Sequence, residues 1–123
     1  SMGYAGLLSF IYAKMDASDP RVAATRDWLI RNYTINENPG LGPQGMFYYY
    51  HTMAKALTIL GEDTLVLPDG RKVAWREELA KRLFDAQDGK GFWVNNNGRW
   101  WEKDPVLVTC YGLLTLERIY HSL

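Results

Sequence analysis

The chain has 123 residues, a hydrophobic fraction of 47% and equal numbers of basic and acidic side chains, so its formal net charge is zero. This length fits one domain with its own core, and a neutral chain without a run of Lys or Arg disfavours nucleic acid and anionic membrane surfaces as partners. The single cysteine, Cys110, excludes an intrachain disulfide, and no apolar run approaches the ~18 residues of a membrane span.

The N-terminal part of the chain predicts two helices of different character. Residues 4–14 form the first, with apolar side chains on nearly every side, which is typical of a helix inside a protein. Asp19 and Pro20 are the expected N-cap and first residue of a second helix that runs to Tyr33. Its expected core-facing stripe consists of Val22, Ala24, Trp28 and Leu29.

The middle of the chain predicts a loop, a third helix and a small β-ribbon. Residues 36–45 contain two Pro and three Gly, which indicates a loop. The third helix spans residues 46–60, is mostly apolar, and is expected to stop at Gly61. Within residues 64–73, Pro68-Asp69-Gly70 predicts a turn between two short strands.

The C-terminal part predicts two more helices joined by a long loop. The fourth helix covers residues 75–86, and residues 87–101 are predicted to contain a short hairpin that turns at Asn97-Gly98. Asp104 caps the expected fifth helix, residues 105–120, which begins with a proline. The core face of the fourth helix is expected to hold Trp75, Leu79 and Leu83.

Helices one, three and five are apolar, whereas helices two and four are amphipathic. This alternation predicts an all-α fold of antiparallel helical hairpins with an inner and an outer layer. The inner helices also repeat, because residues 52–59 align with residues 109–116 and residues 3–10 fit the same register. A repeat of this length is typical of one helical hairpin with its loops.

Residues 87–93, Gln-Asp-Gly-Lys-Gly-Phe-Trp, resemble the Q-x3-G-x-W element of squalene and hopene cyclases. As in that family, an inner helix of the form Thr-x-Tyr-x-Leu-Leu-x-Leu follows, here at residues 109–116, and Tyr50-His51-Thr52 is similar to the start of inner helices in protein-prenyltransferase β-subunits. The resemblance covers nearly the whole chain and implies a terpenoid-cyclase and prenyltransferase α/α toroid around a central cavity. Five helices make two and a half hairpins, so we expect residues 3–123 to be one domain of a longer protein and residues 1–2 to be a cloning remnant.

The resembling element also has a direct physical interpretation. Gln87 can bond backbone groups left unpaired after the fourth helix, and Gly91 allows backbone angles that other residues resist. Trp93 is expected to bury its ring against neighbouring helices. These three residues are therefore predicted to be structural.

The chemistry-bearing motifs of the family are missing from this sequence. It contains neither the D-x-D-D acid of class II terpene cyclases nor the D-D-x-x-D metal box of class I enzymes. It also departs from the prenyltransferase zinc pattern, because Val108 stands where an Asp would precede Cys110, and His51 comes before that cysteine. We therefore expect no metal or other cofactor, and no turnover by this chain alone.

Ligand-binding candidates come from the aromatic side chains and one histidine: Tyr48, Tyr50, His51, Trp100, Trp101 and Tyr111. In cyclases that this chain resembles, aromatic faces stabilise carbocations, although core packing is the alternative role for such rings. Consecutive helical residues point about 100° apart, so at most two of residues 48–50 can face one cavity. His51 is either a ligand contact or a hydrogen-bonding residue within its layer, and Cys110 is expected to be a small buried hydrophobe.

Two functions follow as hypotheses. The first is a squalene-cyclase-like helical repeat domain that forms part of a toroid binding an apolar, isoprenoid-like ligand; the second is a non-catalytic repeat used for protein contacts. The compartment is not indicated, because no signal peptide is visible. Self-association is expected through apolar residues of the first and fifth helices that would face water, namely Gly6, Leu7, Phe10, Ile11, Leu113, Leu114 and Ile119.

Overall fold

Helices account for most of the regular structure over residues 2–123, the part of the chain that the computed structural model describes. In chain order the elements are α1 (Met2–Tyr12), α2 (Pro20–Arg31), α3 (Met46–Leu60), β1 (Leu65–Val66), β2 (Lys72–Val73), α4 (Trp75–Ala86), the 3-10 turn η1 (Arg99–Trp101) and α5 (Pro105–Tyr120). The predicted all-α class is therefore confirmed. Among these residues, no helix combines the length and the apolar character that crossing a membrane requires.

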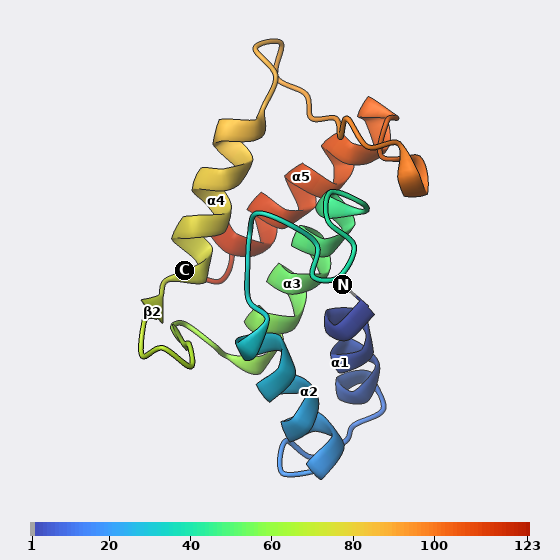
Figure 1. The fold of residues 1–123 in the computed structure, drawn as a ribbon. Helices are drawn as coiled ribbons and strands as arrows, with labels where there is room; N and C mark the ends of the chain where they lie inside the picture. The colour runs from blue at the N-terminus through green and yellow to red at the C-terminus, as the bar shows by residue number, and fades with distance from the viewer. Residues whose placement is uncertain (1) are drawn as a thin grey trace.

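α3 is the central helix. Both α1 and α5 pack against it, while α2 packs on α1 and α4 on α5 (Figure 1). In that view α1, α3 and α5 run in one general direction, and α2 and α4 return in the opposite direction. Because α3 has neighbours on several sides, its side chains fill the core, and Tyr49, Met53 and Ala56 are fully buried.

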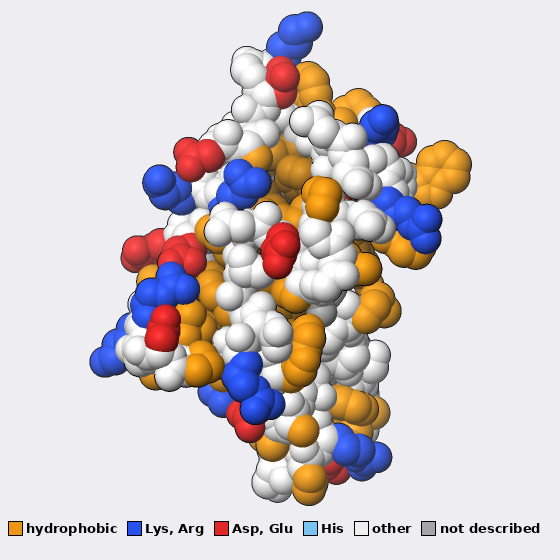
Figure 2. All heavy atoms as spheres, in the orientation of Figure 1, with side chains coloured by type: hydrophobic (Ala, Val, Ile, Leu, Met, Phe, Trp, Pro, Cys, Tyr) orange, Lys and Arg blue, Asp and Glu red, His pale blue; other side chains and the backbone are white. Residues whose placement is uncertain are grey.

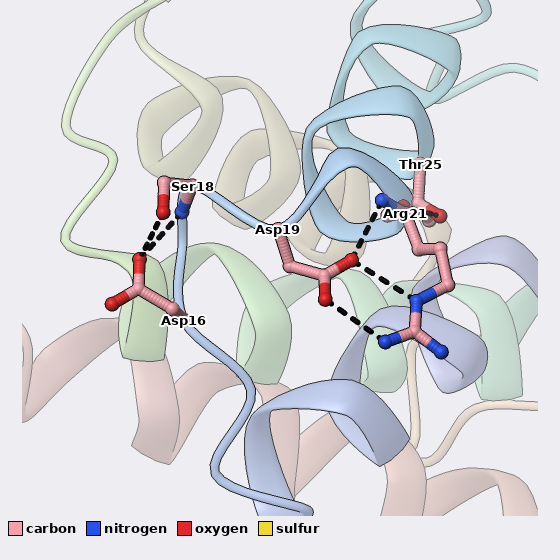
Figure 3. A network of polar contacts seen from close by, with 5 residues as sticks. All are labelled: Asp16, Ser18, Asp19, Arg21 and Thr25. Carbon is pink, nitrogen blue, oxygen red and sulfur yellow. Dashed lines mark hydrogen bonds and ion pairs between the residues drawn. The ribbon is translucent and has the colours of Figure 1, made fainter.

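The predicted start of α2 is confirmed in atomic detail. The Asp19 carboxylate accepts a hydrogen bond from the backbone N–H of Arg21 at 2.9 Å, and the Arg21 guanidinium pairs with the same carboxylate (Figure 3). Hydrogen bonds from the Arg21 side chain and backbone lower the pKa of Asp19 to about 2. Three residues earlier, the Asp16 carboxylate accepts hydrogen bonds from the backbone N–H and the hydroxyl of Ser18 (Figure 3). Carboxylates therefore order the segment that leads into α2.

The other local signals also match the structure. Asp104 caps α5 by accepting a hydrogen bond from Val106 N–H at 2.9 Å, and Gly61 ends α3 in the left-handed conformation at φ 70°. The ribbon pairs Leu65 with Val73, and its turn is closed by the N–H of Gly70 on the carbonyl of Leu67. The core face of α4 is the predicted one, since Trp75, Leu79 and Leu83 are fully buried.

Two helix ends lie earlier in the chain than the sequence predicts. α1 stops at Tyr12 because the backbone turns at Lys14, whose φ is 57°. α2 stops at Arg31. The N–H of Asn32 still donates to the Trp28 carbonyl, but the N–H of Tyr33 donates to the carbonyl of Ile30, only three residues back, so the helical pattern ends there.

The predicted core-facing stripe of α2 is only half right. Val22 and Leu29 are buried, but Ala24 and Trp28 are exposed. α2 packs chiefly on one neighbour, α1, so only a narrow strip of its surface is buried. Val22 and Leu29, seven residues apart, lie on that strip.

The expected exposure of the inner helices needs correction at three positions. Leu7 and Ile119 were expected to face water and are buried, because α1 is held between α2 and α3, and α5 between α3 and α4. Cys110, expected in the core, is exposed on α5. Leu113 and Leu114 are exposed as predicted, whereas Gly6, Phe10 and Ile11 are half-buried.

The hairpin predicted in residues 87–101 does not form. No strands pair across Asn97-Gly98; two side chains shape the turn instead. Asn95 Oδ1 accepts from the Asn97 N–H at 2.9 Å, and Asn97 Oδ1 accepts from the Arg99 N–H at 3.0 Å. These local bonds compete with a strand ladder and lead directly into η1. In Figure 2, charged side chains gather over α4 and the ribbon, while hydrophobic side chains project at the opposite edge over η1.

Candidate functional site

A pocket of about 280 Å³ opens beside the N-terminal end of α3. Side chains and backbone from α1, the loop over residues 36–45, α3, η1 and α5 surround it: Met2, Asn38, Leu41, Gly45, Tyr48, Trp100 and Tyr111. Three of the predicted ligand-binding residues, Tyr48, Trp100 and Tyr111, therefore come together from three separate elements. The volume lies near the lower end of the ~300–1,000 Å³ range of small-molecule sites.

Aromatic rings form one wall of this pocket. The rings of Tyr48 and Tyr111 meet edge to face, with centroids 5.9 Å apart and planes at 68°. His51 stacks on the same Tyr111 ring at 5.9 Å, so it supports the wall from the neighbouring turn of α3. Edge-to-face and stacked pairs of this kind hold rings in fixed positions.

Neither polar group of this wall carries a charge near neutral pH. Burial, together with the negative charge of Glu102, raises the pKa of Tyr111, so its hydroxyl keeps its proton. Burial and the positive charges of Lys55 and Arg118 lower the pKa of His51, so its imidazole is neutral. Tyr111 and His51 therefore add no charge to this aromatic wall.

The two tryptophans of η1 behave differently. Trp100 lies over Gly45, where an added Cβ would come within 3.2 Å of the indole Cδ1. The guanidinium carbon of Arg99 lies 4.7 Å from the centre of the Trp100 ring. Trp101 is 81% exposed and does not line the pocket. Both have left-handed backbones, with φ 61° and 64°, a conformation that costs side-chain-bearing residues about 1–2 kcal/mol each. Strain of this kind is held where the surrounding structure determines the backbone.

Asn38 contributes a buried polar group to the pocket wall. Its side chain is 3% exposed, and its amide nitrogen donates to the carbonyl of Gln44 at 2.8 Å. Its amide oxygen is buried and has no hydrogen-bond partner among the described residues. Buried acceptors are normally paired, so this oxygen is a polar feature in an otherwise apolar wall.

Tyr50 lies away from this pocket, as the helical spacing of residues 48–50 requires. Its hydroxyl donates to the Ile35 carbonyl at 2.6 Å, and its buried ring packs edge to face on Phe47. Tyr49 is also buried, with its hydroxyl on the Thr34 carbonyl at 2.7 Å. Both hydroxyls anchor the segment before the loop to α3.

Glu102 was not among the predicted site residues. Its carboxylate is fully buried and accepts hydrogen bonds from the backbone N–H groups of Phe47 at 3.3 Å and Tyr48 at 2.9 Å. Asn95 donates to it at 2.7 Å. Gly45, the N-cap of α3, has no side chain to bond these groups, so a carboxylate from more than fifty residues later caps the helix instead. Glu102 therefore positions Tyr48 and fixes η1 beside it.

The loop that resembles the cyclase element makes a compact structural unit. Gln87 Nε2 donates to the Gly91 carbonyl at 2.9 Å, and Gly91 has a φ of 91°, which favours glycine. The Trp93 ring is 2% exposed; its indole N–H donates to the Leu83 carbonyl of α4 at 2.8 Å, and its face lies on Gly112 of α5. The unit joins α4 to α5.

Other chemistry is sparse among residues 2–123. No group of three or more His, Cys, Asp or Glu side chains lies close enough together there to hold a metal ion. No family model matches the chain, and no curated protein or solved structure matches it either. Function therefore rests on the geometry of the pocket.

Proposed function

We propose that this chain is a squalene-cyclase- and prenyltransferase-like helical repeat domain, part of an α/α toroid that binds an apolar, isoprenoid-like ligand. The observation that carries the proposal is the pocket beside α3, in which the rings of Tyr48, Trp100 and Tyr111 meet Leu41. No Asp, Glu, Lys, Arg or His side chain lines it, so the transfer of an uncharged hydrocarbon from water into this site is favourable.

The helix arrangement supports the wider architecture. Three helices of one direction, α1, α3 and α5, pack in series, with α2 and α4 outside them in the opposite direction. The loop from Gln87 to Trp93 joins an outer to an inner helix, which is the place that the resemblance implies for it. A toroid repeats this unit around a central cavity.

The proposed role is binding, with no catalytic step assigned to this chain. A cyclase that protonates an alkene needs an acid facing its substrate, and no carboxylic acid lines the pocket. Glu102, the nearest buried carboxylate to Tyr48, already accepts hydrogen bonds from two backbone groups and Asn95.

Titration calorimetry with geraniol, a short isoprenoid alcohol, tests the proposal. We expect saturable binding to the wild-type chain, and about tenfold weaker binding to Leu41→Glu, because a carboxylate at the pocket wall must lose water when the hydrocarbon enters. Ile59→Glu is the matched control, since Ile59 is 41% exposed and Leu41 40%, but Ile59 lies outside the pocket. Absence of saturable heat, or equal affinity for both variants, would contradict the proposal.

One observation favours protein contact as a second candidate function. α5 exposes an apolar face of Val106, Cys110, Leu113 and Leu114, with Val106 71% and Leu113 55% exposed. Neighbouring apolar side chains on one helix face gain free energy when a partner covers them. A second copy of the chain is the simplest partner, through a symmetric interface.

Light scattering at micromolar concentrations tests this second candidate. We expect a mass of twice 14.1 kDa for the wild-type chain and 14.1 kDa for Leu113→Lys, which places a charge in the interface. Phe84→Lys is the control, since Phe84 is 61% exposed and belongs to α4, not α5. A wild-type chain that remains a monomer would eliminate self-association.

A further inference from the structure

A second hollow, of about 270 Å³, lies on the other side of the α3 N-terminus. It is bordered by α3, α4, the loop that precedes α3 and the loop that follows α4. Its walls have two characters. Met46, Phe47 and Val94 provide apolar surface, while Asn36, Arg82 and Asn96 provide polar groups. The pocket beside Tyr48 shares none of these residues.

Arg82 is a cation without a counterion in this hollow. Its half-buried side chain makes one hydrogen bond, from Nε to the Tyr50 hydroxyl at 3.2 Å. Three cations on or near α4 do have acidic partners: Arg71 pairs with Glu78, Arg76 with Asp63, and Lys81 with Asp85. Among the described residues no ion pair involves Arg82, so its two terminal amino groups remain available as a fork of donors.

Neutral donors border the same hollow. The side-chain amides of Asn36 and Asn96 make no hydrogen bond with other described residues, and they come from different loops. The Tyr50 hydroxyl keeps its proton, because burial raises its pKa despite the opposing effect of Arg82. That proton is committed to the Ile35 carbonyl, so Tyr50 holds the guanidinium in place and leaves its outer edge free.

We propose that this hollow binds a small organic acid through its carboxylate. The terminal amino groups of Arg82 form a bidentate pair with the two carboxylate oxygens, the geometry that a guanidinium matches best. The amides of Asn36 and Asn96 donate to the same oxygens from the sides. The hydrocarbon part of the acid lies on Met46 and Val94.

The charges around the hollow favour a singly charged ligand. One uncompensated guanidinium supplies one positive charge. The buried carboxylate of Glu102 lies close enough to raise the pKa of Tyr50, so it adds negative potential near the hollow. A doubly charged phosphate carries one negative charge more than Arg82 can neutralise, and the negative potential of Glu102 repels that excess charge. A monocarboxylate carries a single charge, which Arg82 neutralises. The assignment does not depend on the isoprenoid pocket.

NMR titration of the whole chain with sodium butyrate at constant ionic strength tests this assignment, with the side-chain signals of Arg82, Asn36 and Asn96 as readouts. We expect saturable shifts with butyrate, and binding at least about tenfold weaker for its uncharged amide, butyramide. Arg82→Gln should weaken butyrate binding by about tenfold or more, and Arg82→Lys should retain part of it because the charge remains but the fork is lost.

Arg31→Gln is the matched control, since Arg31 is exposed on α2 and outside the hollow. Unchanged helical circular dichroism in Arg82→Gln and Arg82→Lys would show that both variants fold. Equal binding of butyrate and butyramide, or equal butyrate affinity in Arg82→Gln and Arg31→Gln, would overturn the site. Tighter binding of inorganic phosphate than of butyrate would overturn the choice of a monocarboxylate.

Discussion

Replacing Glu102 with Ala is expected to lower the free energy of unfolding by about 3 kcal/mol. The substitution removes a fully buried carboxylate and leaves the N–H groups of Phe47 and Tyr48 and one donor of Asn95 without their partner. It also removes negative charge from the positive end of the α3 dipole. Domains of this size have about 5–15 kcal/mol of stability in total, so the loss is large.

Urea unfolding followed by circular dichroism measures this effect. Glu102→Gln separates charge from shape: it keeps one acceptor oxygen but turns an amide toward groups that are themselves donors, so an intermediate loss of about 1–2 kcal/mol is expected. Glu117→Ala on α5 is the control, because its carboxylate is 62% exposed and should change stability by no more than about 0.5 kcal/mol. If Glu102→Ala unfolds at the same urea concentration as Glu117→Ala, the carboxylate does not hold α3 in place.

The elements that the sequence predicted correctly have short-range signals. Asp19 and Asp104 cap helices by bonding backbone groups two residues away, and Gly61 stops α3 through its own backbone angles. The turn of the ribbon at residues 68–70 is equally local. Each of these features can be identified from neighbouring residues alone, so tertiary packing did not alter them.

The loop over residues 87–101 shows why the remainder could not be predicted. Asn97-Gly98 is a strong hairpin signal, but the segment that follows it is tied to α3 through Glu102. This contact joins residues more than fifty positions apart, and a glutamate in a polar loop has no local sign of burial. The same contact places Trp100 in the pocket and leaves Trp101 exposed, a distinction that two adjacent tryptophans could not reveal.

The candidate site was predicted in part for a similar reason. Helical geometry alone separates Tyr48 from Tyr50, and the structure places them on opposite sides of α3. Which of the two would meet Tyr111 depends on how α5 packs against α3, which no local pattern encodes. Asn38 and Arg82 could not be identified from the sequence, because each is of interest for an unpaired group. In Asn38 it is the buried amide oxygen, and in Arg82 it is the pair of terminal amino groups.

Replacing Trp93 with Ala is expected to lower the free energy of unfolding by about 3–5 kcal/mol. The ring is 2% exposed between α4 and α5, and its loss leaves a cavity and an unpaired Leu83 carbonyl. Thermal and urea unfolding both measure this. A Trp93→Ala chain with wild-type stability would show that the loop from Gln87 to Trp93 does not join the two helices through this ring.

A second substitution makes the test specific to the Trp93 contact. A Cβ at Gly112 would come within 3.1 Å of two Trp93 ring atoms, so Gly112→Ala should destabilise the wild-type chain by up to about 2 kcal/mol, the overpacking exceeding the gain in helix propensity. In the Trp93→Ala background the clash is gone, and the same substitution should stabilise by about 1 kcal/mol. Gly6→Ala in α1 meets no atom within 4 Å, so it should stabilise by about 1 kcal/mol in both backgrounds. Gly112→Ala should therefore destabilise the chain that has Trp93 and stabilise the Trp93→Ala chain, in which a smaller side chain takes its place. An effect of the same sign in both backgrounds would mean that Gly112 does not accommodate the Trp93 ring.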